Sequence, residues 1–353
     1  MPATFDPSKL GEPVAINQIS RELKKLWDTG TSAPTRASLI NFAIYCQGTE
    51  AMAANTDLIA RFTRNHACRA LLVCVNREAP KPNVQAWINA HCHISRAGAK
   101  QVCCEQISFL LEGEVKGRLT NIVFSNLDSD LPLYFWYQGD LSAQLNPHLW
   151  TWIDRLIVDS VVWKDPKSQF ARLKASIAET NARLTLRDLN WTRSLYMRQA
   201  LSQLFDQPES LAQISKLQRV AITHAPGHRS TAALLIGWFS AQLGWKLNWT
   251  LKDAGVLLYA SASGNPVTVE LREAEGSALS NCELISADAS FSFHRETGSR
   301  YLSTAVTFSD GHEYHHLLPA GPEEIVDLLD EEMTRGSRHN IYLKALAAAE
   351  PLF

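Results

Sequence analysis

Apolar runs in the first half of the chain alternate with amphipathic segments. Arg36 to Cys46 and Arg69 to Val75 are almost continuously apolar, which is typical of strands buried on both faces of a parallel sheet. Between them, the pattern from Thr56 to Phe62 predicts a helix, which gives β-α-β order. Further strands are expected at residues 131–137 and 156–158, and helices at 14–27, 115–127, 141–152 and 167–182.

A strictly alternating segment lies at residues 85–94, and this period of two predicts a strand with one apolar and one polar face. Arg96 to Lys100 has the composition of a turn. We therefore expect residues 102–111 to return as a hairpin partner, with a helix as the alternative.

The second half predicts a β-α-β unit of its own. Val220 to Thr223 is a short strand, Ser230 to Leu243 is a helix that is apolar nearly all round, and Gly244 suits its C-terminal cap. The alternation that starts at Trp245 predicts the next strand, and a parallel pair joined by a buried helix is expected.

Short alternating runs joined by turn residues follow from Gly255 onward. They lie at 256–259, 267–271, 291–293 and 301–308, and Asp310-Gly311 has the composition of a hairpin turn. The sheet should therefore continue antiparallel. Two helices should close the chain, one of them opening at Pro322 with Glu323 and Glu324 in its first turn.

These elements predict an α/β protein of two domains. The first is expected to hold a largely parallel sheet with helices and an added hairpin, and the second a mixed sheet with a β-α-β unit and antiparallel hairpins. The polar segment Lys164-Asp-Pro-Lys167 places the boundary near residues 161–168. The expected domains are therefore residues 1–163 and 164–353, and 353 residues with 46% hydrophobic content are enough to bury a large core.

Charge and composition narrow the class of function. A formal net charge of −2 provides no basic field for a phosphate backbone, so nucleic acid is not expected as a partner. No apolar run approaches the ~18 residues that a membrane span needs, and the N-terminus has no signal-peptide pattern, so a cytoplasmic protein is expected. Seven cysteines, six of them before residue 105, indicate reduced thiols rather than a disulfide framework.

Residues 188–206 form the most informative stretch, which predicts an amphipathic helix behind a short extended segment. Asp188 or Asn190 can cap the first turn, and Trp191 and Arg193 follow directly. The cluster has two interpretations. It is either a capped and buried helix start, or a surface where an aromatic ring, a guanidinium and a carboxylate meet.

The Asp-Leu-x-Trp-x-Arg pattern of this stretch resembles a segment of the glucose-6-phosphate dehydrogenase assembly protein (OpcA) family. Other segments resemble blocks of that family in the same order, from roughly residue 35 to residue 260. They are Arg69 to Val75, Cys103 to Ile107, Asp130 to Trp136, Asp154 to Ser160, Ala232 to Phe239 and Leu243 to Trp245.

The resemblance implies a non-catalytic protein, without a cofactor, that binds glucose-6-phosphate dehydrogenase. It would promote the assembly or allosteric activation of that enzyme and so support the oxidative pentose phosphate pathway. Trp, Tyr and Arg are the side chains that most often anchor interfaces. The expected partner-binding residues are therefore Asp188, Asn190, Trp191, Arg193, Trp136 and Tyr137, although the same residues could equally join the two domains.

Cysteine and histidine patterns give weaker alternatives. His91 and His93 share one strand face and could bind zinc, but Cys92 points the other way, and half-exposed polar strand residues are favoured over a metal site. Cys103 and Cys104 are candidates for a redox role. The resemblance supports this role, because cyanobacterial members of the family are linked to thioredoxin control of their dehydrogenase. Packed, reduced thiols are favoured.

A second class of function would use the loop Thr223-His-Ala-Pro-Gly-His-Arg229, which lies between a predicted strand and a predicted helix. His224 and Arg229 could contact an anion there, which would suit an enzyme that binds a sugar phosphate or a nucleotide. The loop has one glycine and no Walker lysine, so a capped loop is favoured. No G-x-S-x-G elbow or other marked catalytic motif occurs, and we expect no enzyme.

Overall fold

The computed structural model describes residues 7–27, 35–94, 101–114, 118–141, 147–180, 184–251, 255–335 and 340–353. Two compact units make up the chain, and we describe each by itself. Unit 1 contains Met1–Asp159, Ser168–Arg187 and Leu329–Gly336, and unit 2 contains Ser160–Lys167, Asp188–Leu328 and Ser337–Phe353. The sequence predicted one boundary near 161–168, whereas the chain passes between the units more than once, because later segments return to the first sheet.

Unit 1 contains a nine-stranded sheet in the order β1-β5-β6-β4-β3-β7-β8-β9, with β2 paired to β6. Its strands are β1 (Glu12–Pro13), β2 (Thr35–Arg36), β3 (Ile40–Gln47), β4 (Cys68–Asn76), β5 (Asn83–Ile94), β6 (Gln101–Glu112), β7 (Leu133–Tyr137), β8 (Arg155–Val158) and β9 (Thr185–Asp188). The five pairs made by β2 with β6, β3 with β4, β3 with β7, β4 with β6 and β7 with β8 are parallel. The predicted largely parallel sheet is confirmed.

The apolar runs of the sequence form the central, buried strands of the sheet in unit 1. Six consecutive residues of β4, Ala70 to Val75, are buried, and because successive side chains alternate between the two faces, both faces of this strand are covered. The helices of this part are α1 (Ile19–Trp27), α2 (Glu50–Phe62), α3 (Arg118–Asn126), α4 (Pro147–Trp152) and α5 (Pro166–Thr180). Helix α2 connects β3 to β4, and helix α3 connects β6 to β7, so the two connections run in opposite directions across the sheet. Right-handed crossovers therefore place α2 and α3 on opposite faces.

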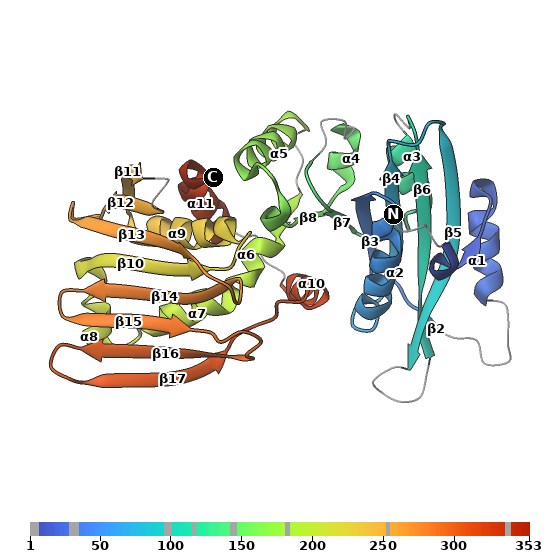
Figure 1. The fold of residues 1–353 in the computed structure, drawn as a ribbon. Helices are drawn as coiled ribbons and strands as arrows, with labels where there is room; N and C mark the ends of the chain where they lie inside the picture. The colour runs from blue at the N-terminus through green and yellow to red at the C-terminus, as the bar shows by residue number, and fades with distance from the viewer. Residues whose placement is uncertain are drawn as a thin grey trace. The chain divides into compact units, whose positions relative to one another are not determined.

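Strands β5 and β6 form the long hairpin visible in Figure 1. The hairpin prediction for residues 85–94 and 102–111 is confirmed, and the helical alternative for the second segment is wrong. The turn predicted at 96–100 lies outside the described residues. The register places Ile94 opposite Gln101 and Asn83 opposite Glu112. Each residue of β5 therefore shares a face with its partner on β6.

Unit 2 contains an eight-stranded sheet in the order β11-β12-β13-β10-β14-β15-β16-β17. Its strands are β10 (Leu217–His224), β11 (Lys246–Leu251), β12 (Val256–Ala260), β13 (Pro266–Glu273), β14 (Leu279–Ser286), β15 (Ala289–His294), β16 (Tyr301–Phe308) and β17 (Glu313–Pro319). Among these described strands, only β10 and β13 pair in parallel, and the other pairs are antiparallel. The predicted mixed sheet is confirmed.

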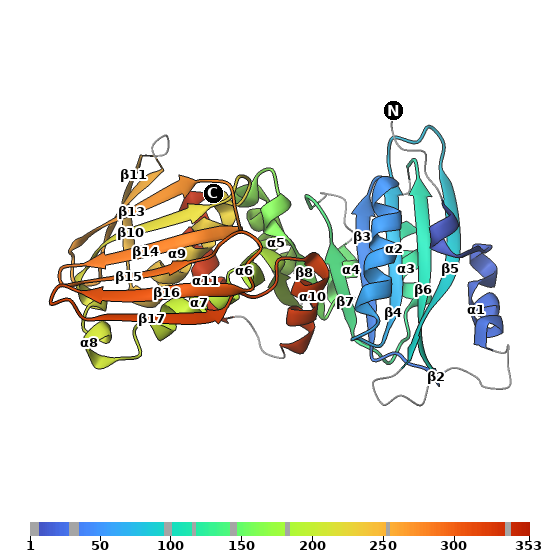
Figure 2. The same ribbon diagram turned by 60° about the horizontal axis from the view of Figure 1, so that its bottom comes forward.

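The helices of unit 2 are α6 (Leu189–Arg193), α7 (Leu195–Gln203), α8 (Pro208–Leu211), α9 (Arg229–Leu243) and α11 (Asn340–Ala349), while α10 (Ile325–Thr334) begins in unit 2 and ends in unit 1. Helices α7 and α9 pack on the strands of the sheet, and α11 packs on α9. Figures 1 and 2 show α7 and α9 along the same side of the sheet. Apolar side chains of these two helices form one core cluster with inward residues of the strands, among them Leu201, Ile236, Val269 and Phe291.

Two predictions for the second half need correction. The crossover from β10 through α9 leads to β11, but β11 is an edge strand, and the hairpin of β12 and β13 lies between it and β10. The predicted neighbours are therefore not adjacent, because a later strand, β13, takes the place beside β10. Helix α10 begins at Ile325 rather than at Pro322, and Glu323 pairs with Arg295 at 3.0 Å instead of entering the first turn.

Candidate functional site

The predicted cluster at residues 188–193 is a buried polar centre of unit 2. Asp188 caps α6, and its Oδ1 accepts hydrogen bonds from the backbone N–H groups of Asn190 and Ser160, both at 3.0 Å. Its Oδ2 accepts from the hydroxyls of Ser160 at 2.7 Å and Tyr342 at 3.0 Å. Asp188 is fully buried. A buried carboxylate is stable only when donors surround it in this way.

Asn190 carries the same network to helix α9. Its Nδ2 donates to the hydroxyl oxygens of Ser160 at 3.0 Å and Ser230 at 3.1 Å, and its Oδ1 accepts from the Thr231 hydroxyl. Asn190 and Thr231 are both fully buried. The network therefore joins α6 to the first turn of α9, and Tyr342 joins both to α11.

Trp191 packs inside unit 2. The guanidinium carbon of Arg198 lies 3.2 Å from its ring centroid, and Nη1 of Arg198 donates to the Trp191 carbonyl at 2.9 Å. The ring of Tyr342 also lies beside Trp191, with the two ring centroids 5.5 Å apart. Trp191 is 5% exposed and Arg198 6% exposed. This is a cation–π contact of the desolvated kind, and it uses the ring that was expected to reach a partner.

The remaining three predicted contact residues lie at two places. Arg193 is half-buried at the end of α6. Trp136 and Tyr137 lie on β7 of unit 1, at 4% and 0% exposure, and Tyr137 stacks on Tyr45 with centroids 4.5 Å apart. The interpretation as a capped, buried helix start is confirmed for Asp188. A contact role for the six residues stays a prediction, and only Arg193 is even half-exposed.

Ser160, Arg198 and Tyr342 complete the buried centre, although no local sequence pattern indicated them. Ser160 is the last residue of the block Asp154 to Ser160, for which the sequence indicated a resemblance to the family but no site role. Tyr342 lies 154 positions after its hydrogen-bond partner Asp188, so no local pattern could connect the two residues.

The cysteine expectation requires a correction. Cys92 and Cys103 form a disulfide with a Cα–Cα distance of 4.1 Å, because the register of β5 and β6 places them directly opposite each other. Cys104 points to the other face, where its Sγ lies 3.7 Å from the Ala37 carbonyl oxygen. The thiol of Cys68 donates a hydrogen bond to Cys104, which lowers the pKa of Cys104 to about 7. The remaining five thiols, Cys46, Cys68, Cys74, Cys104 and Cys282, are free and buried, as expected for packed cysteines.

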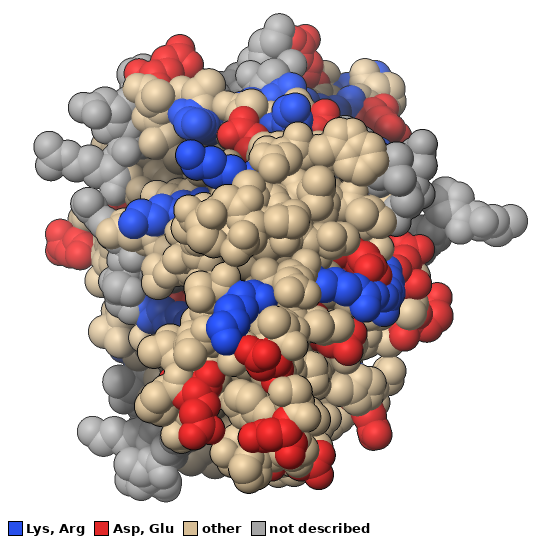
Figure 3. Space-filling model, turned by 90° about the vertical axis from the view of Figure 1, so that its left-hand side faces the viewer, with Lys and Arg blue, Asp and Glu red and all other residues tan. Residues whose placement is uncertain are grey.

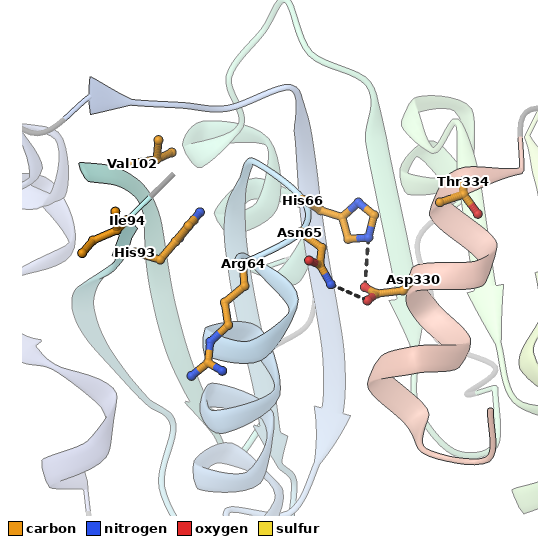
Figure 4. Close-up of a pocket in the computed structure, with 8 residues that line it drawn as sticks. All are labelled: Arg64, Asn65, His66, His93, Ile94, Val102, Asp330 and Thr334. Atoms are coloured by element: carbon orange, nitrogen blue, oxygen red, sulfur yellow. Dashed lines mark hydrogen bonds and ion pairs between the residues drawn. The ribbon is translucent and has the colours of Figure 1, made fainter. Parts of the chain in front are cut away.

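A pocket of about 540 Å³ lies in unit 1 and is shown in Figure 4. His66 Nε2 and Asp330 Oδ1 are 2.9 Å apart, and Asn65 Nδ2 donates to Asp330 Oδ2 at 2.7 Å. The side chains of His93 and Arg64 line the pocket without reaching this pair. The hydroxyl of Thr334 donates to a backbone carbonyl. Within unit 1, the His66–Asp330 pair therefore holds the end of α10 in place. Among the described lining residues, no hydroxyl is hydrogen-bonded to this pair as a nucleophile would be.

The order of the parallel strands in unit 1, β6-β4-β3-β7-β8, is that of a doubly wound sheet. Such sheets bind ligands at the carboxyl ends of the strands where the order reverses, here between β3 and β7. The turn after β3 contains Gly48 with φ 83°, and a Cβ built there would overlap the carboxylate of Glu50. Asn55 and Gln138 exchange two amide hydrogen bonds beside this turn, at 3.0 and 2.7 Å. Side chains thus occupy the crevice.

The 223–229 loop joins β10 to α9 as predicted. His224 is 2% exposed, and its Nδ1 lies 2.9 Å from the carbonyl oxygen of Ala225. His228 occupies the N-cap position, with Nδ1 3.2 Å from the hydroxyl of Thr231. Arg229 is exposed. Both histidine rings of the loop therefore have a polar neighbour in the loop or in the first turn of α9. The choice between a capped loop and an anion site stays a prediction.

Metal-binding patterns find no support in the described part of the chain. His91 Nε2 is 2.6 Å from Gln106 Oε1, and burial lowers the pKa of His91. Groups of three or more His, Cys, Asp or Glu with the arrangement of a metal site do not occur among the described residues. None of the described helices is both long and apolar enough to span a membrane. Figure 3 shows basic and acidic side chains interspersed with uncharged surface on one face of the molecule.

Two family models match the chain in sequence order, and both describe a glucose-6-phosphate dehydrogenase subunit. Residues 60–175 match its N-terminal domain, and residues 184–346 match its C-terminal domain. The chain belongs to the OpcA family. The resemblance of the short sequence blocks is thereby confirmed.

Two OpcA relatives are similar over part of their length. The putative OxPP cycle protein OpcA of Nostoc punctiforme is 27% identical over 175 residues, which cover 49% of this chain and 37% of the relative. The protein of the same description from Synechococcus elongatus is 26% identical over 182 residues, covering 51% and 40%. The matched part thus spans less than half of either relative.

Solved structures of similar extent are distant in sequence. The putative oxidoreductase yvaA of Bacillus subtilis is 7% identical with a TM-score of 0.46, covering 90% of this chain and 95% of that one. The probable oxidoreductase yhhX is 8% identical with a TM-score of 0.45, covering 89% and 95%.

Proposed function

We propose that this chain binds glucose-6-phosphate dehydrogenase and promotes its assembly or allosteric activation, without catalysing a reaction of its own. The observation that carries the proposal is the pair of OpcA family models, which match the chain in order and are both described as domains of a glucose-6-phosphate dehydrogenase subunit. Both relatives are described as putative OxPP cycle proteins, which supports a role in the oxidative pentose phosphate cycle. The chain would act in the cytoplasm.

The non-catalytic part of the proposal is supported by the switch point of unit 1. A pyrophosphate bound there would need the N–H groups at the start of α2 and a surface free of negative charge. The Glu50 carboxylate lies against Gly48 in that turn instead. The amide pair of Asn55 and Gln138 links α2 to the end of β7. These contacts disfavour a dinucleotide in this crevice.

An activator of this kind acts by binding one state of its partner more tightly than another. The shift in the enzyme's population equals the difference in affinity, so a ~10-fold preference for the active oligomer contributes about 1.4 kcal/mol. Binding to both states with the same affinity would leave the rate unchanged. The proposal therefore predicts a change in kinetics as well as a complex.

The test is a titration of the dehydrogenase from the same organism with this chain. Initial rates are measured against glucose 6-phosphate, and complex formation is followed by size-exclusion chromatography with light scattering. A saturable fall in KM or rise in kcat, together with co-elution, is expected. The absence of both a rate change and a complex would overturn the proposal. A turnover of glucose 6-phosphate by the chain alone would overturn its non-catalytic part.

A further inference from the structure

Strand β17 forms one border of the eight-stranded sheet, and β16 is its only neighbour among the described strands. Figures 1 and 2 show β17 along this border. The residues of the strand, Glu313–Pro319, are all exposed except Leu318, which is half-buried. They pair with β16 without a shift of register. A regular border strand of this kind can pair with a further strand on its other side.

Hydrogen bonds at both ends of the β16–β17 hairpin show how the backbone groups of β17 are directed. The N–H of Phe308 donates to the His312 carbonyl at 2.8 Å, and the N–H of Ala320 donates to the Arg300 carbonyl at 2.9 Å. In an antiparallel pair, such hydrogen-bonded positions alternate with positions whose N–H and C=O groups point away from the neighbouring strand. The even-numbered residues of β17 therefore bond to β16, and the odd-numbered residues direct these groups outward.

The outward backbone groups belong to Glu313, His315 and Leu317, while Pro319 has no N–H to donate. Outside the ladder with β16, no backbone hydrogen bond to these three residues occurs in the described part of the chain. Their spacing of two residues corresponds to about 6.8 Å along the strand, which is the repeat of an antiparallel ladder. The border therefore offers donors and acceptors in the arrangement that a further antiparallel strand needs.

The side chains of β17 do not protect this border. Natural proteins protect border strands with Lys, with Pro inside the strand or with a bulge. Strand β17 has no Lys or Arg, and its proline is the last residue. The opposite border differs, because β11 begins with Lys246 and has a register shift between Leu247 and Trp249. We therefore expect pairing at β17 and not at β11.

A second copy of this chain supplies a strand that fits the border. A twofold axis at His315 sets β17 antiparallel to itself, with His315 opposite the same residue of the second copy and Glu313 opposite Leu317. In this register, every outward N–H group of both copies meets an outward carbonyl. Moving the axis by one residue in either direction would set one outward residue against the turn or against Pro319, so hydrogen bonds would be lost.

The side chains that this register brings together are compatible. Tyr314 is 42% exposed, packs on Phe308 with ring centroids 6.3 Å apart, and would face His316 of the second copy. Such cross-strand aromatic pairs stabilise antiparallel sheets. The two Glu313 carboxylates would lie four residues apart along the ladder, or about 13 Å, which is beyond the ~10 Å range of unscreened charge at 0.1 M salt. The contact therefore sets no like charges against each other.

We propose that β17 is a dimerisation strand, through which two copies of this chain pair antiparallel about a twofold axis at His315 and join their sheets into one. The inference goes beyond the proposed function and does not depend on the dehydrogenase. The contact is one strand wide and smaller than the ~800 Å² that each partner buries in a standard interface, so a reversible dimer is expected. A strand of another protein is the competing occupant.

The test uses cysteine substitutions at two neighbouring histidines of the full-length chain. His315→Cys sets two thiols opposite each other across the axis, with Cα atoms about 5.5 Å apart, which a disulfide can span. His316→Cys is the matched control. His316 is also exposed, but it would lie opposite Tyr314, about 8 Å from the same residue of the second copy, beyond the ~7 Å that a disulfide can bridge. The five native free thiols are buried and should not react.

Three measurements decide the inference. Circular dichroism establishes that both variants fold. Sedimentation velocity of the wild type over a concentration series gives the mass in solution. Mild oxidation, followed by a non-reducing gel and mass spectrometry of the linked peptides, shows which variant forms a covalent dimer.

The expected results are a wild-type mass that rises with concentration toward twice the 39.3 kDa of the chain, and a covalent dimer of His315→Cys but not of His316→Cys. A wild type that stays a monomer up to ~1 mM would overturn the inference. Equal linkage of both variants, or linkage of the control alone, would also overturn it. A complex of the dehydrogenase with a chain that is itself always monomeric would overturn the inference and leave the proposed function standing.

Discussion

The buried carboxylate of Asp188 permits a prediction that separates its structural role from a contact role. In Asp188→Ala, the backbone N–H groups of Ser160 and Asn190 lose their acceptor and cannot rotate away, whereas the hydroxyls of Ser160 and Tyr342 can. Each buried donor left without a partner costs ~1–3 kcal/mol. We therefore expect the alanine variant to lose about 4 kcal/mol of the free energy of unfolding.

Asp188→Asn is the matched control for this substitution. The amide oxygen can accept from the same two backbone N–H groups, and its NH₂ group can donate to the two hydroxyl oxygens after they rotate. The substitution removes only the charge on the acceptor. Hydrogen bonds to charged groups are stronger than neutral ones by ~1 kcal/mol. The expected loss for Asp188→Asn is about 1–2 kcal/mol, clearly smaller than for alanine.

Equilibrium unfolding in urea, followed by far-UV circular dichroism, measures both losses, and unchanged m-values show that the comparison is valid. Equal losses in the two variants, or a loss below ~1 kcal/mol in Asp188→Ala, would refute the hydrogen-bond argument. The dehydrogenase affinity of folded Asp188→Asn gives a second reading. A buried site predicts an unchanged Kd, whereas a weaker complex from an intact fold would favour the contact role first predicted for Asp188.

Three further outcomes follow from the packing, the ion pairs and the disulfide. A Cβ at Gly237 would overlap the backbone of α11, so Gly237→Ala should lower stability by about 2 kcal/mol despite the ~1 kcal/mol gained in helix propensity; a melting temperature at or above wild type would contradict this. Arg219 and Arg272 lower the pKa of Glu270 from 4.5 to about 2, so this pairing stabilises the fold above pH 4.5 and is lost as the pH falls toward 2. Arg219→Gln should therefore cost about 1 kcal/mol at pH 7, after allowance for solvent screening; the difference from wild type should vanish near pH 2 in acid melting curves, and a constant difference would count against the pairing. Cys92→Ser should lower the free energy of unfolding by roughly 2–3 kcal/mol in oxidising buffer, and it should have no effect once dithiothreitol has reduced the wild type. An equal melting temperature of the wild type with and without the reductant would show that the disulfide adds no stability.

Local sequence patterns determined much of the secondary structure, because period and capping act within a few residues of the chain. The apolar run that became β4 indicated a strand covered on both faces, and the alternation of residues 85–94 indicated a half-exposed strand. Gly244 ends α9 with φ 68°, as its position after the apolar helix predicted. Asp188 caps α6 for the same local reason.

Tertiary structure decided which strands became neighbours. The sequence placed β10 and the strand after α9 side by side, but β13 takes the position beside β10, and no local pattern encodes a pairing between residues about 50 positions apart. The Cys92–Cys103 disulfide likewise depends on the hairpin register, and a shift by one residue would turn the two side chains to opposite faces.

The candidate sites show the same division. The sequence by itself determined the family and indicated Asp188, Asn190 and Trp191 as a special cluster, because their spacing is local. Only the fold decided that this cluster is buried, since Tyr342, which covers it, comes from the far end of the chain. The sheet of unit 2 is the converse case. The alternation of inward and outward residues is local to each strand, and only the pairing of eight strands joins the outward residues into one surface.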